Sequence, residues 1–341
     1  MNKYKKLIDD IKYYGLCEYI NLQKEMKKNK QEDEFYDYTT VTLPFYKTPF
    51  TLEDAIKKYT YTLPKCSISP KIDDKSIICS SILGDMIGRP YEMCFSQNLD
   101  CLPFFKMIDE NLKFTDDTVM TVATLDVLLN SKETIMEKQF ESSYIKWAKK
   151  YPAAGYGPAF NMWFNSPEPH PYGSFGNGSA MRISPCILME NFVDVITTAY
   201  YSAICTHNHE EGIKGAIVTA VCLYIAKTYD KSEAIKLITD YMKKQYPISQ
   251  YVNGFAKPLE EFSFTCSCSC QLTVPIAIKT AVITNSFEEF CETIIKHGGD
   301  TDTLCAIGGP ISACLNGFNY TNKVLSVLPE EFIKILNSIT I

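Results

Sequence analysis

The sequence lacks the features that mark a nucleic-acid binder or a cross-linked secreted domain. Its 40 acidic residues outnumber its 34 basic ones, which gives a net charge of −6 and a pI of about 5.4. This balance excludes the basic surface that nucleic-acid recognition needs. None of the fourteen cysteines forms a CxxC pair, so neither a zinc ribbon nor a disulfide framework is indicated. We therefore expect reduced, mostly buried thiols.

Long apolar runs are also absent. The longest one worth testing, 216–226, is flanked by Lys214 and Lys227 and is too short to span a bilayer. The first residues, MNKYKKLIDDIKYYG, do not contain the apolar centre of a signal peptide. We expect an intracellular protein, cytoplasmic in the simplest case, that does not associate with a membrane.

The pattern that is present is helical. From residue 75 onward, apolar residues recur at spacings of three and four, and no alternating series predicts strands. The sequence predicts an all-α fold with one main domain over 71–341. An N-terminal extension over 1–70 precedes it, with amphipathic helices in 1–40 and a proline-containing linking segment in 41–70. The helices expected in the main domain are 75–88, 116–130, 134–149, 179–189, 192–206, 210–227, 231–245, 273–284, 287–297, 301–317 and 329–338.

Glycines gather in four places, 84–88, 155–157, 173–178 and 298–309, beside acidic and polar residues. Glycine permits positive φ and close approach of two backbones. Several such loops in a helical protein indicate that helix ends converge on a ligand.

Two turns rich in aspartate and threonine each open an apolar helix. We name them the first acidic turn (Thr115, Asp116 and Asp117) and the second acidic turn (Asp300, Asp302 and Thr303). Helix N-capping explains either turn alone equally well, because Thr and Asp are favoured there. However, a cap needs one side chain and each turn supplies several.

If the two helix starts face each other, four carboxylates meet. Such a group is unfavourable away from water unless cations neutralise it. Oxygen ligands suit Mg²⁺, Mn²⁺ or Ca²⁺ rather than zinc, and two divalent ions would balance four carboxylates. The sequence therefore predicts a centre with two cations, provided that the turns meet.

Five motifs carry a resemblance to a known family: SSILGDMIGRPYE (80–92), FTDDT (114–118), GSFGNGSAMR (173–182), THNH (206–209) and GGDTDT (298–303). In this order they resemble the ADP-ribosylglycohydrolase family over roughly residues 76–320. The resemblance implies an all-α hydrolase with two Mg²⁺ or Mn²⁺ ions. It implies cleavage of the glycosidic bond between ADP-ribose and an acceptor, either an ADP-ribosylated protein or a small conjugate.

The resemblance also implies roles for individual residues. Both acidic turns would supply the metal ligands. Glu92 stands where the family has a carboxylate that orients or deprotonates water; otherwise it is an exposed acid in a loop. Asp85 is expected to cap or hydrogen-bond a neighbouring loop rather than to bind metal. Pro310 departs from the family's pattern and predicts altered geometry within its own helix.

A glycine loop (Phe175, Gly176, Asn177, Gly178 and Ser179) is implied to bind substrate. Its backbone amides, at the start of a helix, can hold a diphosphate, and Phe175 can stack on adenine. His207 would line the pocket for the distal ribose or phosphate, and Arg182 would support this region. The alternatives are an ordinary turn, a packed aromatic ring and a histidine that hydrogen-bonds within the core.

Three other functions are compatible with parts of the pattern. They are an inactive ADP-ribose-binding relative, a two-metal nucleotide phosphohydrolase and a purely structural helical protein. The intact acidic turns argue against the first, and the Gly, Asp and Thr residues at helix starts argue against the third. The products distinguish the second, since it would release AMP. We expect a monomer.

Overall fold

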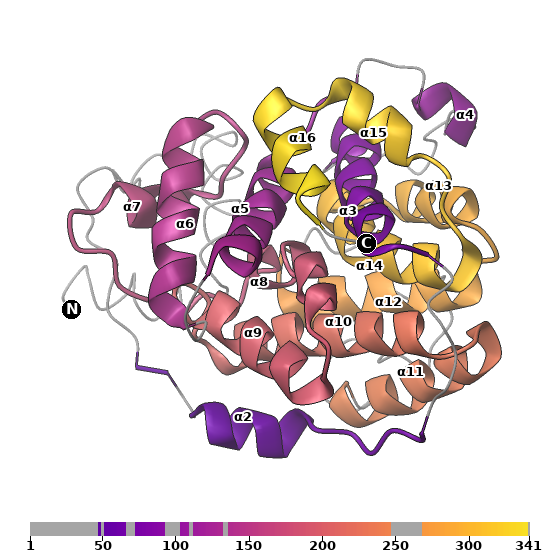
Figure 1. Ribbon diagram of the computed structural model, residues 1–341, viewed down its shortest axis with the longest axis horizontal. Helices are drawn as coiled ribbons and strands as arrows, with labels where there is room; N and C mark the ends of the chain where they lie inside the picture. The colour runs from indigo at the N-terminus through magenta and orange to yellow at the C-terminus, as the bar shows by residue number, and fades with distance from the viewer. Residues whose placement is uncertain are drawn as a thin grey trace, which may run out of the picture.

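In the computed structural model, the regular secondary structure of the described residues consists of helices (Figure 1). The described residues are 47–48, 51–65, 72–92, 103–108, 112–131, 136–246 and 268–339. Within them the one pairing of extended backbone is an isolated antiparallel bridge between Gly176 and Ser269. The predicted all-α fold is confirmed.

Most of the expected helices are present with bounds close to those predicted. They are α3 (Asp74–Gly88), α5 (Asp116–Asn130), α6 (Glu137–Lys150), α9 (Phe192–Ile204), α10 (Glu210–Thr228), α11 (Lys231–Gln245), α12 (Cys270–Ile283), α13 (Phe287–His297), α14 (Thr301–Asn316) and α16 (Glu330–Asn337).

The expected single helix over 179–189 is wrong. The structure has a short helix α8 (Gly178–Met181) followed by a 3₁₀ helix η3 (Ser184–Leu188). Pro185 lies in the first turn of η3, where it supplies no N–H and its ring disfavours an α conformation in the residue before it. The proline thus favours a break between the two helices.

The linking segment expected over 41–70 contains a helix, α2 (Leu52–Tyr59). Thr51 and Asp54 form a capping box, and Ala55 and Tyr59 are buried where α2 packs against α9. The other helices that periodicity did not predict are η2 (Arg89–Tyr91), α4 (Phe104–Met107), α7 (Pro158–Asn165) and α15 (Thr321–Val327). They are short, so few repeats of the pattern mark them. The helices expected in 1–40 lie outside the described residues.

Helices α3 and α14 form the centre of the core. Nearly every residue of both is buried, whereas α6 and α16 each have a polar face. Helices α12 and α10 pack on the far side of α14, and α5 packs against α3 (Figure 1). The second acidic turn therefore begins a helix of this central pair, and the first acidic turn begins a helix that packs against the pair.

Close contact between α3 and α14 depends on glycine. A Cβ atom on Gly88 would lie 2.4 Å from the Thr301 carbonyl oxygen and 2.5 Å from the Asp302 Cα. One turn earlier, a Cβ on Gly84 would lie 2.5 Å from the Cys305 carbonyl oxygen. The Thr301 hydroxyl donates to the Gly88 carbonyl at 2.8 Å. The end of α3 is thus held directly against the first turn of α14.

Pro310 lies inside α14 without ending it. Proline has no N–H, so the Ala306 carbonyl, one turn back, loses its usual helical donor. The Ser81 hydroxyl of α3 donates to that carbonyl at 2.8 Å. The second acidic turn precedes Pro310 by two turns of helix, and α14 is continuous between them.

The described cysteines agree with the expected reduced thiols. Nine are free, and all of these but Cys268 are buried. In the part of the chain that the structure describes, no helix has the length and apolarity needed to cross a membrane.

We predict that Gly88→Ala lowers the free energy of unfolding by about 2 kcal/mol or more, because the added methyl group meets backbone atoms that have no room to move. The measurement is denaturant unfolding followed by circular dichroism. Gly317→Ala is the control: no atom lies within 4 Å of its Cβ position, so only its positive φ costs energy, about 1 kcal/mol. Equal losses in the two variants would contradict the role given to close helix contact.

Candidate functional site

The first acidic turn begins α5 and uses its threonine as the cap. The Thr115 hydroxyl accepts a hydrogen bond from the Asp117 N–H at 3.2 Å. The carboxylates of Asp116 and Asp117 are thereby left for other partners. Asp117 is buried and Asp116 is half-buried.

Asp85 of α3 holds this turn in place. Its carboxylate accepts from the Thr115 N–H at 2.9 Å, the Thr115 hydroxyl at 2.8 Å and the Thr118 N–H at 3.1 Å. The Thr118 hydroxyl donates to it as well. Burial raises the pKa of Asp85, and these four donors oppose that rise. The prediction that Asp85 hydrogen-bonds a neighbouring loop is confirmed.

The second acidic turn follows two glycines in the left-handed region. Gly298 has φ of 77° and Gly299 of 88°, which side-chain-bearing residues rarely adopt. Asp300 occupies the N-cap position of α14, yet its side chain forms no capping hydrogen bond. N-capping therefore does not explain the Asp300 carboxylate.

The two acidic turns are in direct contact, as the sequence analysis required. The Thr303 hydroxyl donates to Asp117 Oδ2 at 3.3 Å, across 186 positions of sequence. Thr115 Oγ1 lies 3.3 Å from the same oxygen, although its proton is shared with the nearer Asp85 carboxylate. The expected meeting of the two helix starts is confirmed.

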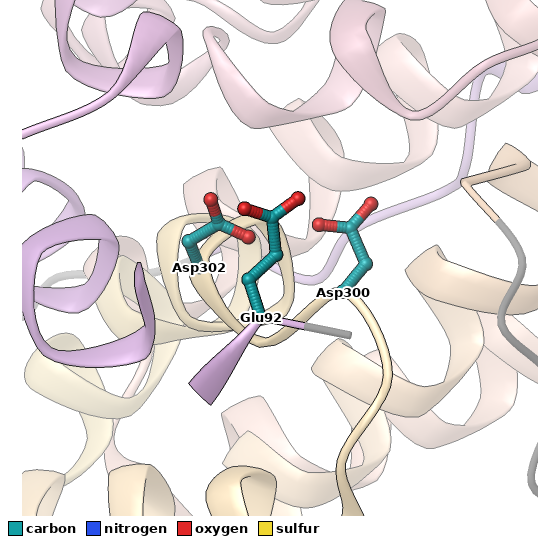
Figure 2. A group of neighbouring side chains, drawn as sticks. All are labelled: Glu92, Asp300 and Asp302. Carbon is teal, nitrogen blue, oxygen red and sulfur yellow. The ribbon is translucent and has the colours of Figure 1, made fainter. Parts of the chain in front are cut away.

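Glu92 joins the second acidic turn. Figure 2 shows the carboxylates of Glu92, Asp300 and Asp302 directed toward one another, and one oxygen of each lies within 4.8 Å of the others. Both aspartates are buried, and Glu92, directly after η2, is exposed. Three oxygen ligands with this spacing can hold a cation. The sequence analysis gave Glu92 a role toward water, and the structure adds its proximity to two of the expected ligands.

The crowding of carboxylates makes their ionised forms unfavourable. Burial, followed by the charges of Asp85 and Asp300, raises the pKa of Asp116 to about 8. Burial and neighbouring aspartates also raise the pKa values of Asp117 and Asp302 well above the usual range. Within the described residues, no lysine or arginine forms a salt bridge with these three or with Asp300.

One oxygen of Asp117 gives a direct test of whether a cation fits. Asp117 Oδ1 is buried and has no hydrogen-bond partner among the described residues. A buried carboxylate oxygen without a partner is costly, and a hard cation would satisfy it. The donor set of both turns consists of carboxylate and hydroxyl oxygens, which agrees with Mg²⁺ or Mn²⁺.

The glycine loop lies beside the second acidic turn. The Asn177 side-chain amide donates to Asp300 Oδ2 at 2.7 Å and to the Thr273 hydroxyl at 3.1 Å. The Asn177 N–H donates to the Cys268 carbonyl at 2.7 Å. Sequence reasoning placed Asn177 toward the substrate, and it did not foresee this contact with an expected metal ligand.

The other predicted substrate residues are placed around the same loop. Ser179 is fully buried, and its hydroxyl donates to the Gly212 carbonyl at 2.7 Å, so its side chain ties α8 to α10. Phe175 is half-buried, with its ring 5.1 Å from that of His209. His207 is buried against the loop. Its Nε2 lies 3.1 Å from the place that a Cβ atom on Gly178 would take, and 3.6 Å from the corresponding place on Gly176.

The sequence analysis missed one further neighbour of the first acidic turn. The Cβ position of Gly155, whose φ is 106°, lies 3.6 Å from Asp116 Oδ1. Next to it, the Tyr156 hydroxyl is buried without a hydrogen-bond partner in the described structure. Burial and the charge of Asp116 raise the pKa of Tyr156. The available signal was the glycine cluster 155–157, which marked the loop but no residue in it.

Comparison with solved structures supports the same fold. The ADP-ribosylglycohydrolase-related protein complex matches this chain with a TM-score of 0.55 and 20% identity, covering 78% of this chain and 97% of its own. At this level of identity the match establishes the fold alone.

Curated relatives match most of their length. ADP-ribosylhydrolase ARH3 of Mus musculus is 30% identical, covering 71% of this chain and 83% of its own. The Homo sapiens protein of the same name is 25% identical, covering 72% and 85%. YegU of Escherichia coli (strain K12), an uncharacterized protein, is 26% identical, covering 71% and 87%.

The sequence profile of the ADP-ribosylglycohydrolase family matches residues 76–337, which include both acidic turns, the glycine loop and Glu92. That match covers more than half of the chain, and membership of this family supports hydrolysis of ADP-ribose linkages. The chain belongs to the ADP-ribosylglycohydrolase family.

Proposed function

We propose that the protein hydrolyses the glycosidic bond between ADP-ribose and an acceptor, with two Mg²⁺ or Mn²⁺ ions held between the acidic turns. The observation that carries the proposal is the contact between the turns. Among the described residues, this contact gathers aspartates that lack a salt-bridge partner around a buried carboxylate oxygen that has no hydrogen-bond partner. The acceptor is a side chain of an ADP-ribosylated protein or a small conjugate. The intracellular location and the monomeric state expected from the sequence remain predictions.

The ligands assigned to the ions are Thr115, Asp116, Asp117, Asp300, Asp302 and Thr303. Bound there, divalent cations would neutralise the carboxylates, hold hydroxyl groups of the distal ribose and polarise the reacting sugar. The threonine hydroxyls fit this assignment, because Thr303 donates its proton to Asp117 and Thr115 donates its proton to Asp85, and each oxygen keeps a lone pair for a cation.

The chain's own groups supply the remaining chemistry. Glu92, exposed at the edge of the second acidic turn, orients water or takes its proton. The water oxygen bonds to the anomeric carbon while the bond to the acceptor breaks, and the acceptor leaves with a proton. Neighbouring carboxylates stabilise the positive charge that develops on the sugar. The backbone N–H of Gly178 is the donor assigned to the diphosphate, because the N–H of Gly176 donates to the Ser174 hydroxyl oxygen and that of Asn177 to the Cys268 carbonyl. Phe175 stacks on adenine.

The central test is incubation of the purified protein with an ADP-ribosylated protein in Mg²⁺, with products identified by mass spectrometry. We expect free ADP-ribose in Mg²⁺, none in EDTA, and a turnover about 100-fold or more lower in Glu92→Gln because the group that handles water is neutral. Release of AMP would identify a phosphohydrolase instead. Binding of ADP-ribose without any product would identify an inactive relative. Turnover that is indifferent to chelation would exclude the metal centre.

Replacement of a proposed ligand should remove metal binding before it removes the fold. We predict that Asp302→Ala weakens Mn²⁺ binding by more than about 100-fold, since supporting partners of metal ligands alone are worth about 10- to 100-fold. The measurement is titration calorimetry with Mn²⁺, and circular dichroism reports the helices. Asp126→Asn is the matched control, because Asp126 lies farther along α5 and pairs with Lys146 and Trp147. Equal metal affinity in the two variants would contradict the assignment of Asp302 as a metal ligand.

The stability of the metal-free protein should fall as the pH rises toward 8. The pKa of Asp116 is about 8 in the folded chain and near 3.8 without the fold, so the folded state binds more protons between these values. Stability is therefore greatest at the low end and is lost as Asp116 ionises. The useful window is about pH 7.5 to 8.5. Burial lowers the pKa values of His207, His209 and His297 in the fold, and this window also lies above their titration near 6.5 in the unfolded chain.

The measurement is the melting temperature across this window in EDTA and in saturating Mg²⁺. We expect a fall with pH in EDTA, and a stabilisation by Mg²⁺ that grows with pH because the ion binds ionised carboxylates. Asp116→Asn should flatten the dependence seen in EDTA. A melting temperature that rises with pH in EDTA, and does so equally in Asp116→Asn, would contradict the account.

A further inference from the structure

A buried arginine side chain follows the glycine loop in the sequence. Arg182 follows α8 directly and is 1% exposed, with its guanidinium carbon 4.2 Å from the centre of the Tyr144 ring. Its Nη2 donates to the Ser202 carbonyl at 2.7 Å and to the Thr206 hydroxyl oxygen at 3.0 Å. In the described part of the chain it forms no salt bridge with a carboxylate. Its position is therefore fixed by neutral partners.

The Thr206 hydroxyl connects Arg182 to His207. Thr206 Oγ1 lies 2.7 Å from His207 Nδ1, and either atom can donate according to the tautomer of the ring. Arginine has donors only, so the Thr206 oxygen must accept from Arg182. The single proton of the Thr206 hydroxyl then has His207 Nδ1 as its acceptor.

The opposite arrangement leaves a buried donor with only a weak partner. If Nδ1 carried the proton, it would donate to the Thr206 oxygen, and the Thr206 hydroxyl proton would have only the Cys205 sulfur, a weak acceptor, in place of the ring nitrogen. Thr206 is 0% exposed, so water does not replace that acceptor. Hydrogen-bond satisfaction thus favours the tautomer in which Nδ1 accepts and Nε2 carries the proton.

A doubly protonated ring is also disfavoured. Burial, together with the charge of Arg182, lowers the pKa of His207 well below its ordinary value. The imidazole is neutral at physiological pH, and Nε2 faces Gly178 and Gly176 of the glycine loop.

We propose that Thr206, oriented by Arg182, is a positioning residue that fixes the tautomer of His207, so that Nε2–H is a permanent donor to a phosphate oxygen of ADP-ribose at the glycine loop. The ligand in this inference rests on the function proposed above. The tautomer rests only on the hydrogen bonds within the chain. A neutral donor suits this place, because its strength does not change with pH in the range where the acidic turns ionise.

The test combines a spectroscopic signature with affinity. Long-range ¹⁵N–¹H spectra of the protein labelled at its four histidines show which ring nitrogen carries the proton. His207→Gln identifies the signal. We expect Nε2–H in the wild type and in Thr206→Ser, which keeps the hydroxyl. In Thr206→Val, we expect Nδ1–H to appear and the affinity for ADP-ribose in Mg²⁺ to fall about tenfold, since the donor toward the ligand is lost.

Thr219→Val is the control for loss of a buried threonine hydroxyl. The Thr219 hydroxyl has no hydrogen-bond partner in the described structure, so this variant should keep both the tautomer and the affinity. In turnover assays Thr206→Val should raise KM more than it lowers kcat, because the lost contact binds the substrate's phosphate and not the reacting atoms.

Either of two results would overturn the inference. They are Nδ1–H in the wild type, or a Thr206→Val variant that keeps Nε2–H and the wild-type affinity. If Thr206→Val does not fold, the wild-type tautomer and the Thr206→Ser affinity decide the question. A wild-type protein with Nε2–H that does not bind ADP-ribose would instead refute the proposed function and the assigned ligand, while the fixed tautomer would stand.

Discussion

The site depends on the close contact between the end of α3 and the first turn of α14. Gly88 lets the two backbones touch at Thr301 and Asp302. Just before this contact, Asp85 holds the first acidic turn, and just after it the chain brings Glu92 to the second. A single stretch of α3 and η2 thus sets the positions of both turns. Any shift of α3 along α14 would move Glu92 and the first acidic turn relative to the second acidic turn.

This arrangement holds several mutually repelling carboxylates close together at fixed positions. The Asp85 carboxylate is compensated by four hydrogen bonds, whereas Asp116, Asp117 and Asp302 are not compensated to the same degree. The fold therefore separates an acid that organises the turn from the acids whose charges are less compensated. Such a division is typical of binding sites, where groups are held ready at a cost to the stability of the unliganded chain.

Much of the site could be predicted from the sequence, because it lies at helix starts that local pattern marks. Helix α5 begins at Asp116 and α14 at Thr301, as periodicity and capping chemistry indicate. The contact between the turns required the structure, since no local signal reports which of two distant helix ends is near the other.

Partners within the site were less predictable than its members. The amide of Asn177 is committed to Asp300, and the hydroxyl of Ser179 to the Gly212 carbonyl. Both are long-range hydrogen bonds that a motif cannot specify. Helix α2 was not predicted, because the prolines around it indicate a linking segment. Its capping box at Thr51 and Asp54 was nevertheless a signal in the sequence. The division of 179–189 was readable too, at Pro185.

The pairing of Ser81 with the Ala306 carbonyl has a wider consequence. Pro310 leaves the Ala306 carbonyl of α14 without its helical hydrogen-bond donor, and the Ser81 hydroxyl of the neighbouring helix α3 donates to that carbonyl instead. Ser81 and Pro310 are thus linked through one carbonyl group, although they lie far apart in the sequence. A relative with an ordinary residue at the proline position would have its own N–H for that carbonyl, and the serine would then be free to vary. Substitution at either position is therefore best interpreted together with the residue at the other.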